Sequence, residues 1–439
     1  MQNEPQDAEV IVIGAGMAGL TAARALAERG ISVLILEARE HVGGRVLSKQ
    51  VDGAMVELGA EFVHGRPPEL WALIEEVGIE TIGRDGAMLR AQSGGGVVED
   101  DPQDDSMLSP LEQLEDYDGD DIPFAEWLKT SGVPEWQRGA LLGYVEGFNA
   151  ADAGCIGIHA LAAQQKAEDA IDGDRAWHVH GGYALLAEYL ARRVRELGGT
   201  IVLGAVVRQI EWQPGSVHVV TESGAEFRAE KCIVTVPLGV LQRANRGGVE
   251  IIPEPPAVEA ARRLAMGDAV RFTMVFRRAW WVDAPVALST ETLRSMSFLF
   301  TQETVPAVWW TPHPEPGPAM LTAWIGGPRS AKLMGQTAEQ LGEAACCTLA
   351  RVFGLAEEDV RRELVSTHTH DWAGDPFSLG AYSYVPAGAL DAPRAMTESA
   401  FGTLFFAGEH TDVTGHWGTV HAAIRSGLRA AEQVFGEIS

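Results

Sequence analysis

The opening of the chain, AEVIVIGAGMAGLTAARALAERGISVLILE, constrains the fold more than any other stretch. Residues 10–13 form a continuous apolar run that predicts a buried strand, and the glycine turn of residues 14–16 follows directly. Apolar residues then recur at helical spacing until Gly30 ends the predicted helix, and residues 32–36 predict a second strand. The order strand, turn, helix, strand predicts a βαβ unit in a parallel sheet.

The turn has the spacing of a dinucleotide-binding fingerprint, carried by Gly14, Gly16 and Gly19. Glycines at these positions allow a tight turn, a close approach of the backbone to a pyrophosphate, and close packing of the helix on the strand. Free N–H groups at the helix N-terminus favour the negative charge of the pyrophosphate. Glu37 ends the second strand, where a carboxylate can accept hydrogen bonds from ribose hydroxyls. The sequence therefore predicts a dinucleotide site, and both FAD and NAD fit this signal.

A second glycine pair follows the second strand. Gly43 and Gly44 offer another close approach of the backbone to a ligand, and Arg45 offers a guanidinium that can pair with phosphate in a bidentate manner. The alternative is an ordinary glycine turn with a surface arginine.

Periodicity divides the rest of the chain into helical and strand-rich stretches. Helices are predicted within residues 123–132, 134–148, 181–199, 336–363 and 419–435. Strands are predicted within residues 200–212, 216–224, 225–237, 269–276 and 403–406. A chain of 439 residues is long for one domain, which favours two domains.

The formal net charge of −27 disfavours binding to nucleic acid or to an anionic membrane, because phosphate groups require a basic face. It suits a cationic substrate, although acidity also serves solubility. Residues 98–121 are rich in acids and contain no Lys or Arg, which predicts a solvated insertion or the rim of a substrate entrance.

Targeting signals are also absent from the sequence pattern. The polar N-terminus lacks the features of a secretory signal, and no apolar run is long enough to span a bilayer. The four cysteines have no metal-binding spacing and suit free thiols. We therefore expect a cytoplasmic protein without a membrane anchor, and the sequence favours no particular oligomeric state.

Four segments together resemble the flavin-containing amine oxidase superfamily, which includes monoamine oxidases, polyamine oxidases and lysine-specific histone demethylases. They are VIVIGAGMAGLTAARALAERGISVLILEAREHVGGR, VELGAEFVHG, CIVTVPLGVL, and DWAGDPFSLGAYSYV followed by LFFAGEHTDVTGHWGTVHAAIRSGLRAAEQV. The segments bracket residues 8–435, so the resemblance covers essentially the whole chain.

The resemblance implies a mixed α/β and α+β fold. It consists of a discontinuous Rossmann-like FAD-binding domain, of the glutathione-reductase type, interleaved with a substrate domain of mixed sheet and helices. The implied FAD-binding domain covers residues 1–80, 195–255 and 396–439, and the implied substrate domain covers residues 81–194 and 256–395.

The resemblance also implies that the last strand, loop and helix return to an FAD site built by the start of the chain. Glu409 would accept a hydrogen bond from the ribityl chain, residues 418–420 would lie at the pyrimidine edge of the isoalloxazine, and Val207 would contact adenine. Trp372 would pack against the isoalloxazine, and residues 59–61 would pass beside it. The implied FAD-binding residues are Gly14, Gly16, Ala18, Gly19, Glu37, Ala38, Arg39, Gly43, Gly44, Arg45, Gly59, Ala60, Glu61, Phe62, Val207, Trp372, Tyr382, Gly408, Glu409, Gly418, Thr419 and Val420.

Five residues are implied on the catalytic side: Tyr382, His64, Arg271, Trp417 and Thr419. Tyr382 resembles the aromatic residue that forms a wall in front of the flavin ring in this family. His64 matches a histidine near the substrate amine in several polyamine oxidases, and the alternative is a hydrogen-bonded loop histidine. Many members carry a second tyrosine facing the first, where this chain has Thr419, so the aromatic cage is one-sided or uses Trp417.

Two further positions depart from the family pattern. Ala381 stands where monoamine oxidases have the cysteine that bonds to the flavin, so we expect non-covalent FAD. Arg271 stands where the family has a lysine that holds a water against flavin N5 and is linked to reoxidation by dioxygen. Arginine does not reproduce the geometry of an ammonium group, so we expect slow reoxidation. The alternatives are that Arg271 faces away, forms an ordinary ion pair or binds a substrate carboxylate.

The implied function is an FAD-dependent amine oxidase that acts on a small-molecule amine and O2, with no metal. A neutral primary or secondary amine, or a polyamine, would give a hydride from its α-carbon to flavin N5; water would hydrolyse the imine, and O2 would reoxidise the flavin to release H2O2. The alternatives are a flavin dehydrogenase or desaturase with another electron acceptor, a flavoprotein that only binds partners, and an L-amino-acid oxidase. The last would need an arginine for the substrate carboxylate, for which the candidates are Arg84, Arg90 and Arg271.

An apolar substrate pocket would favour the uncharged amine, because burial of an ammonium is costly. The candidate lining residues are Trp281, Phe298, Trp309, Trp310 and Trp324. Glu61 and Glu146 are weaker candidates for steering a second cationic group of the substrate.

Overall fold

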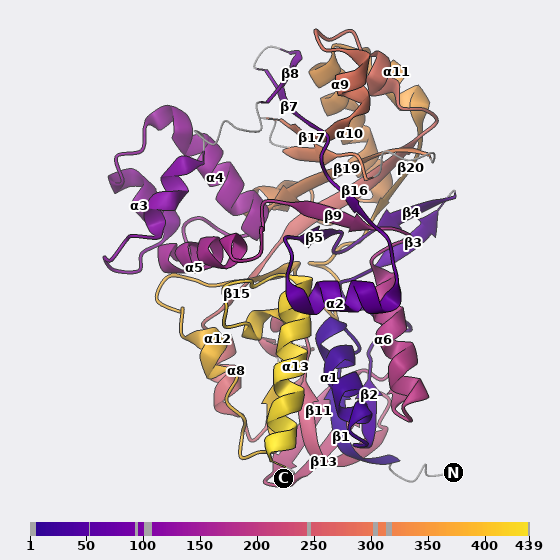
Figure 1. Ribbon diagram of the computed structural model, residues 1–439, viewed down its shortest axis with the longest axis vertical. Coiled ribbons are helices and arrows are strands. Elements are labelled where there is room, and N and C mark those ends of the chain that lie inside the picture. The colour runs from indigo at the N-terminus through magenta and orange to yellow at the C-terminus, as the bar shows by residue number, and fades with distance from the viewer. Residues whose placement is uncertain are drawn as a thin grey trace.

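In a computed structural model, the chain folds around two large β-sheets. The structure describes residues 6–51, 53–92, 95–100, 108–243, 247–301, 306–312 and 318–437. The first sheet and its helices form the lower part of the molecule in Figure 1, and the second sheet forms the upper part. A lobe of helices projects to one side, formed by α3 (Phe124–Thr130), α4 (Glu135–Asn149) and α5 (Ile158–Asp169).

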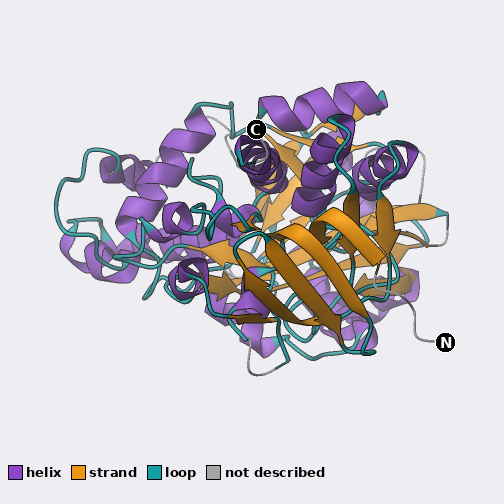
Figure 2. Cartoon of the chain, turned by 90° about the horizontal axis from the view of Figure 1, so that it is seen from below, coloured by secondary structure: helices purple, strands orange, loops and turns teal. Residues whose placement is uncertain are grey.

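The first sheet has eight strands in the order β10-β2-β1-β13-β12-β11-β14, and β22 also pairs with β13. Their bounds are β1 Gln6–Ile13, β2 Val33–Leu36, β10 Thr200–Val202, β11 Val207–Gln213, β12 Ser216–Thr221, β13 Glu226–Val234, β14 Glu250–Ile252 and β22 Leu404–Phe406. The segment 200–212 forms two strands at distant positions in the sheet, because Gly204 turns the chain at a φ of 67°. Figure 2 shows these strands from below as one twisted layer with helices against it.

The long strand β13 explains how the end of the chain reaches its beginning. Residues 226–229 of β13 pair with β12, and residues 232–234 pair with β22. Both β1 and β22 run parallel to β13. The carboxyl ends of β1, β13 and β22 therefore meet at one edge of the sheet, which is where open α/β sheets bind their ligands.

Two helices from opposite ends of the chain, α1 (Met17–Glu28) and α13 (Val420–Gly436), pack side by side on this sheet (Figure 1). At their crossing, a Cβ on Gly427 would lie 2.3 Å from the backbone oxygen of Ala18. Only glycine allows this approach, so the contact fixes where α13 begins relative to the glycine turn before α1. The neighbouring helices are α2 (Pro68–Val77) and α6 (Ala184–Glu196).

The second sheet has the order β20-β16-β19-β18-β17-β7-β8. Its bounds are β7 Ala87–Ala91, β8 Val97–Glu99, β16 Ala269–Phe276, β17 Met296–Phe300, β18 Val308–Trp310, β19 Ala319–Gly326 and β20 Leu364–Thr369. Every residue of β16 is buried. Alternate residues such as Phe272 and Met274 enter a core with α10 (Ala338–Phe353), while Arg271 faces the opposite side, as the period of two in a strand requires.

One helical stretch is interrupted. Residues 336–363 form α10 and α11 (Glu357–Glu363), because Gly354 adopts a φ of 66° and ends α10.

The helical lobe contains features that periodicity did not predict. The helix α5 was not expected, and the acidic insertion is not wholly solvated. Residues 101–107 of that insertion lie outside the described residues, but Ser109–Leu114 forms a short 3-10 helix. Its Leu111 and Leu114 are buried in a cluster with Phe124 of α3. Apolar residues at this spacing therefore anchor the described part of the insertion against the lobe.

Three small sheets connect the larger parts. They are β3 (Ser48–Val51) with β4 (Ala54–Glu57), β5 (Phe62–His64) and β6 (Thr81–Gly83) on either side of β9 (Ala176–Val179), and β15 (Ala265–Gly267) with β21 (Tyr382–Tyr384). The remaining short helices are α7 Leu238–Leu241, α8 Pro256–Ala261, α9 Thr290–Arg294 and α12 Ala392–Ala395. His64 lies in β5 and Tyr382 lies in β21, and both residues line the cavity between the two large sheets. The boundaries of the two implied domains stay a prediction.

The cysteines and helices carry two further findings. All four cysteines are free thiols. Within the ranges that the structure describes, no helix combines the length and apolarity needed to cross a bilayer.

The crossing of α1 and α13 yields a test of stability. Replacing Gly427 with Ala should lower the free energy of unfolding by about 1–3 kcal/mol, the usual cost of overpacking, because the new methyl group must push the two helices apart. Gly436→Ala is the matched control in the same helix, since no atom lies within 4 Å of the added Cβ. Denaturant unfolding measures both variants, and equal midpoints would contradict a tight contact at Gly427.

Candidate active site

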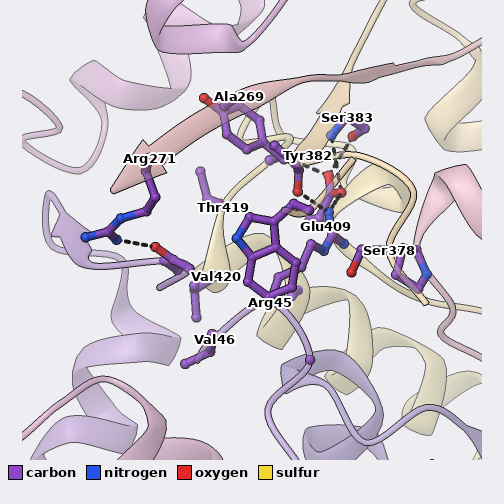
Figure 3. A pocket seen from close by; sticks show the side chains of 18 of the residues that line it. Arg45, Val46, Ala269, Arg271, Ser378, Tyr382, Ser383, Glu409, Thr419 and Val420 are labelled. Atoms are coloured by element: carbon purple, nitrogen blue, oxygen red, sulfur yellow. Dashed lines mark hydrogen bonds and ion pairs between the residues drawn. The ribbon is translucent and has the colours of Figure 1, made fainter. Parts of the chain in front are cut away.

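One cavity of about 1170 Å³ gathers residues from both large sheets and from the helical lobe. Figure 3 shows residues from both ends of the chain, including Arg45 and Glu409, pointing into it together. Among all the residues implied for the cofactor and catalytic sites, only Gly19 does not line it. The volume exceeds the range of about 300–1000 Å³ that holds one small ligand, so the cavity has room for a cofactor and a substrate.

The glycine turn forms one wall. Gly14 has a φ of 105°, and a Cβ on Gly19 would lie 2.0 Å from the oxygen of Gly14. Gly16 differs, because no atom lies within 4 Å of a Cβ built on it. Gly14 and Gly19 are therefore required by the turn itself, whereas Gly16 leaves open space that a pyrophosphate can occupy. Gly43 pairs with Gly16 in a parallel bridge, which brings the second glycine pair to the same wall.

The carboxylate of Glu37 is buried beside this turn. It accepts hydrogen bonds from the backbone N–H of Ala15 at 2.6 Å and from that of Arg39 at 2.9 Å. These bonds tie the end of β2 to the turn after β1. The guanidinium of Arg39 donates to Asp375 at 2.9 Å and to the Ser378 hydroxyl at 2.8 Å, which ties the same corner to the segment that precedes β21.

Glu409 joins three distant segments of the chain (Figure 3). Its carboxylate accepts from Arg45 at 2.8 Å, from the Ser383 hydroxyl at 2.5 Å and from the backbone N–H of Gly418 at 2.9 Å. Burial alone would raise the pKa of Glu409, but Arg45 and these hydrogen bonds outweigh burial and hold the pKa below its ordinary value. Glu409 is therefore an anion in the cavity wall, and Arg45 is its counter-ion.

A flat wall of the cavity is formed by Trp372. Its indole N–H donates to the oxygen of Leu58 at 2.8 Å, and a Cβ on Gly59 would lie 3.2 Å from its ring. The segment of residues 59–61 can therefore pass directly beside the indole.

Arg271 forms a buried ion pair. One guanidinium nitrogen donates to Glu61 at 2.6 Å, and another donates to the oxygen of Gly59 at 2.6 Å. Trp310 also donates to Glu61, at 3.0 Å, and the Nδ1 atom of His178 lies 3.3 Å from it. The Nε atom of Arg271 is buried without a hydrogen-bond partner. Arg271 thus lines the cavity, and two of its nitrogens are already occupied.

Aromatic rings enclose the end of the cavity near Arg271. The Tyr382 ring lies nearly parallel to that of Trp324, with 6.3 Å between the centroids and 13° between the planes. The Tyr382 hydroxyl donates to the oxygen of Phe148 at 2.6 Å, which fixes the ring. Phe62, Phe298 and Trp310 continue the aromatic lining.

Trp417 and Thr419 hold the start of α13. The Trp417 indole donates to the oxygen of Asp412 at 2.8 Å. The Thr419 hydroxyl donates to the oxygen of His416 at 2.7 Å and accepts from the N–H of Ala422 at 3.2 Å, so it caps the helix. The ring found parallel to Tyr382 is therefore Trp324, whereas the sequence had directed attention to Trp417.

His64 is a neutral imidazole. Burial lowers its pKa to about 4, and its ring contacts Phe62 at 5.7 Å and Phe148 at 5.8 Å between centroids. His421 also lines the cavity, and its pKa falls to about 2, chiefly through burial and then through the neighbouring His416 and Arg425. Near neutral pH, neither histidine adds positive charge to the cavity.

Some expected lining residues lie elsewhere. Trp281 and Trp309 are buried in the core of the second sheet and do not line the cavity. Arg84 donates to the backbone oxygens of Ser297 and Thr311, so its guanidinium is occupied by the main chain. Glu146 does not line the cavity either, and Arg329 is a charged neighbour.

Sequence reasoning missed several cavity residues on the helical lobe: Trp136, Gly139, Ala140, Gly143, Tyr144, Gly147 and Phe148 of α4, and Gln164 and Glu168 of α5. For α4, the available signal was an aromatic and glycine face at helical spacing. For α5, the run IHALAAQQKAED after Gly157 has high helix propensity but little amphipathic contrast, which explains why it was missed.

The walls of the cavity offer a fit for a dinucleotide. The open space at Gly16 and the adjoining α1 N-terminus suit a pyrophosphate. Over the described ranges, no group of three or more His, Cys, Asp or Glu residues could hold a metal ion. None of the four cysteines lines the cavity, and Ala381 does line it.

The two kinds of glycine in the turn yield a test of the cofactor site. Gly16→Ala should weaken FAD binding by about tenfold or more, because the methyl enters the open space and overpacking costs about 1–3 kcal/mol. The flavin-free protein should unfold like the wild type. Gly19→Ala should instead lower stability directly, since its methyl meets Gly14 at 2.0 Å. Quenching of FAD fluorescence by the apoprotein gives the affinity. A wild-type affinity in Gly16→Ala would contradict the placement of the pyrophosphate at this turn.

Comparison with known proteins places this geometry in a family. The model of the flavin containing amine oxidoreductases matches residues 17–435, which is nearly the whole chain.

Similar proteins of known name include histone demethylases and a polyamine oxidase. The chain is 30% identical to lysine-specific histone demethylase 1 homolog 2 of Oryza sativa subsp. japonica, over 97% of this chain and 57% of that protein. It is 28% identical to lysine-specific histone demethylase 2 of Homo sapiens, over 97% of this chain and 53% of that protein. It is 27% identical to polyamine oxidase 4 of Oryza sativa subsp. japonica, over 97% of this chain and 88% of that protein. The chain thus spans little more than half the length of the demethylases.

Solved structures share the fold. A double mutant of putrescine oxidase has a TM-score of 0.83 at 20% identity, covering 99% of this chain and 100% of that chain. Cyclohexylamine oxidase from Brevibacterium oxydans IH-35A has a TM-score of 0.81 at 22% identity, covering 99% and 100%. These likenesses confirm the expected mixed α/β fold. The chain therefore belongs to the family of flavin-containing amine oxidoreductases.

Proposed function

We propose that this protein oxidises a small primary or secondary amine, with O2 as the electron acceptor. When bound, FAD would supply the two-electron oxidation of the amine to an imine, which water would hydrolyse to a carbonyl compound, with O2 as the final electron acceptor reduced to H2O2. The observation that carries the proposal is the aromatic end of the cavity, where Tyr382 and Trp324 lie parallel and the charged pair Arg271 and Glu61 is internally neutralised. FAD is held there without a cysteine thioether, because no cysteine lines the cavity.

The aromatic end selects the neutral amine. An ammonium buried among Phe62, Phe148 and Phe298 would lose its hydration without a free carboxylate at that end. Neutral His64 can accept a hydrogen bond from the amine N–H and direct its lone pair. Tyr382 and Trp324 orient the carbon chain beside their stacked rings, which is the role that we assign to them.

The remaining walls suit the parts of FAD. We assign the pyrophosphate to Gly14, Gly16 and Gly43, and the ribose to Glu37, which keeps acceptor capacity beyond its two backbone bonds. We assign the isoalloxazine to the space beside Trp372 and the start of α13. The N-terminus of that helix favours negative charge, so it can stabilise the reduced ring.

Three alternatives have less support. An L-amino-acid oxidase needs a free arginine, but Arg84 binds backbone oxygens, Arg90 pairs with Asp100, and Arg271 pairs with Glu61. A histone demethylase remains compatible with the named relatives, yet the chain covers little more than half of those proteins. A flavin dehydrogenase would share this cavity and differ in the electron acceptor.

Amine screening tests the proposal and also yields a pH prediction. A peroxide-coupled assay across monoamines, diamines and amino acids should give H2O2 with amines; reduction of the flavin by amines without H2O2 would identify a dehydrogenase.

The second-order constant for anaerobic flavin reduction should rise with pH, because deprotonation of a substrate ammonium with a pKa near 10 produces the form that binds. With a monoamine, no step is expected near pH 6.5, since His64, with a pKa of about 4, is already neutral there. A step that disappears in His64→Gln would contradict this assignment.

The Arg271 pair yields a prediction about reoxidation. Because two nitrogens of its planar guanidinium already donate to Gly59 and Glu61, Arg271 cannot offer a water the compact donor geometry of an ammonium. Arg271→Lys should accelerate reoxidation by O2 by about tenfold, or about 1.4 kcal/mol of activation free energy, with a smaller change in flavin reduction. Stopped-flow measurement of both half-reactions decides the question. Arg84→Lys is the control. Equal rates of flavin reoxidation in the wild type and both variants would show that Arg271 does not affect the reaction with O2.

A further inference from the structure

Glu168 differs from the other carboxylates that line the cavity. Glu37 accepts from two backbone N–H groups, and Glu61, Asp100 and Glu409 each pair with an arginine. By contrast, the Oε2 atom of Glu168 is buried without any hydrogen-bond partner. Among the described cavity carboxylates, Glu168 is thus the one with an unsatisfied buried oxygen. Such a group needs an explanation, because a buried acceptor without a donor is costly.

The surroundings of Glu168 are apolar and acidic. Glu168 lies in the last turn of α5, and burial, with a smaller contribution from Asp169, raises its pKa to about 7. Tyr144 of α4 lines the same cavity, and its pKa is raised to about 12 by burial and then by the charge of Glu168. A cation delivered to this place would stabilise the carboxylate by Coulomb attraction and by the missing hydrogen bond.

A row of rings connects Glu168 to the aromatic end. Tyr144 stacks on Phe148, with 5.6 Å between centroids and 6° between planes, and Phe148 lies 5.8 Å from the ring of His64. Phe148 also accepts the hydrogen bond from Tyr382 through its backbone oxygen. A ligand chain that lies along these rings would have one end near Tyr382 and the other near Glu168.

The same face of α4 leaves room for such a chain. Its glycines at positions 139, 143 and 147 recur every four residues and line the cavity. No atom lies within 4 Å of a Cβ built on Gly139 or Gly147. The wall is therefore open along the helix, between aromatic side chains that favour an alkyl chain.

We propose that Glu168 binds a second, charged ammonium group of the substrate, which makes the preferred substrate a diamine or polyamine. This inference rests on the proposed amine oxidation and assigns its substrate class. The reacting end is neutral and lies among Phe62, His64 and Tyr382, whereas the remote end stays protonated and pairs with Glu168. Glu146, the carboxylate favoured by sequence for this role, lies outside the cavity lining.

Matched substrates and variants test the pairing. Putrescine and hexamethylenediamine are compared with butylamine and hexylamine by anaerobic stopped-flow reduction of the holoenzyme, which separates Kd from the limiting rate. The wild type should bind at least one diamine about tenfold or more tightly than its monoamine, the scale of a charge-assisted hydrogen bond. Glu168→Gln should remove this preference through Kd, with the limiting rate and the monoamine values little changed. Asp169→Asn, the adjacent acid that does not line the cavity, should keep the preference.

Three outcomes overturn the assignment: no diamine preference in the wild type, a preference that survives in Glu168→Gln, or an equal loss for monoamines and diamines. Failure of the proposed oxidation is recognised separately, because then no amine reduces the flavin in any variant. In that case calorimetric titration of hexamethylenediamine and hexylamine into the oxidised holoenzyme decides the role of Glu168. A diamine preference that depends on Glu168 supports the site, and equal binding of both amines rejects it.

Discussion

The parallel pairing of β13 with β1 and β22 is the constraint on which the rest of the structure depends. It places the turn after β1 and the loop after β22 at one edge of the sheet, although they come from opposite ends of the chain. The close contact of α13 with α1 at Gly427 then sets the position of the loop before α13. The cavity exists because these two contacts hold the ends of the chain together, and its second side is added by β16 and the helical lobe.

Charge in the cavity is arranged in pairs. Arg45 with Glu409 and Arg271 with Glu61 are short ion pairs, and each joins segments that are distant in sequence. Glu409, Arg271 and Glu61 are buried, and Arg45 is partly buried. Removing one partner of such a pair leaves an uncompensated buried charge, which typically costs about 3–5 kcal/mol. These pairs therefore make the cavity nearly neutral and rigid at the places where FAD and the amine would lie. The pairing also explains why Glu168, which lacks it, stands out.

The sequence predicted the first βαβ unit, most strands of the first sheet and the long C-terminal helix, because their apolar periodicity and glycine stops are local signals. Almost all of the residues that it named for the cofactor and catalytic sites line the cavity, because they lie in motifs that carry chemistry at fixed spacing. The parts that it missed depend on tertiary contacts. The sequence named Trp324 as a candidate lining residue, but its position parallel to Tyr382 depends on the pairing of β19 with β16. The helix α5 has too little amphipathic contrast to be recognised. Trp281 and Trp309 could not be assigned to core or cavity without the strand orientation.

The hydrogen bond from the Tyr382 hydroxyl to the oxygen of Phe148 joins β21 to the helical lobe at the last residues of α4. It therefore links the part of the protein that would hold the flavin to the part that would hold the body of the substrate. A ligand that displaced the helical lobe from β21 would break this hydrogen bond, at a cost of about 1 kcal/mol, or roughly fivefold in affinity. The side chain at the reacting end thus also holds the helical lobe in place.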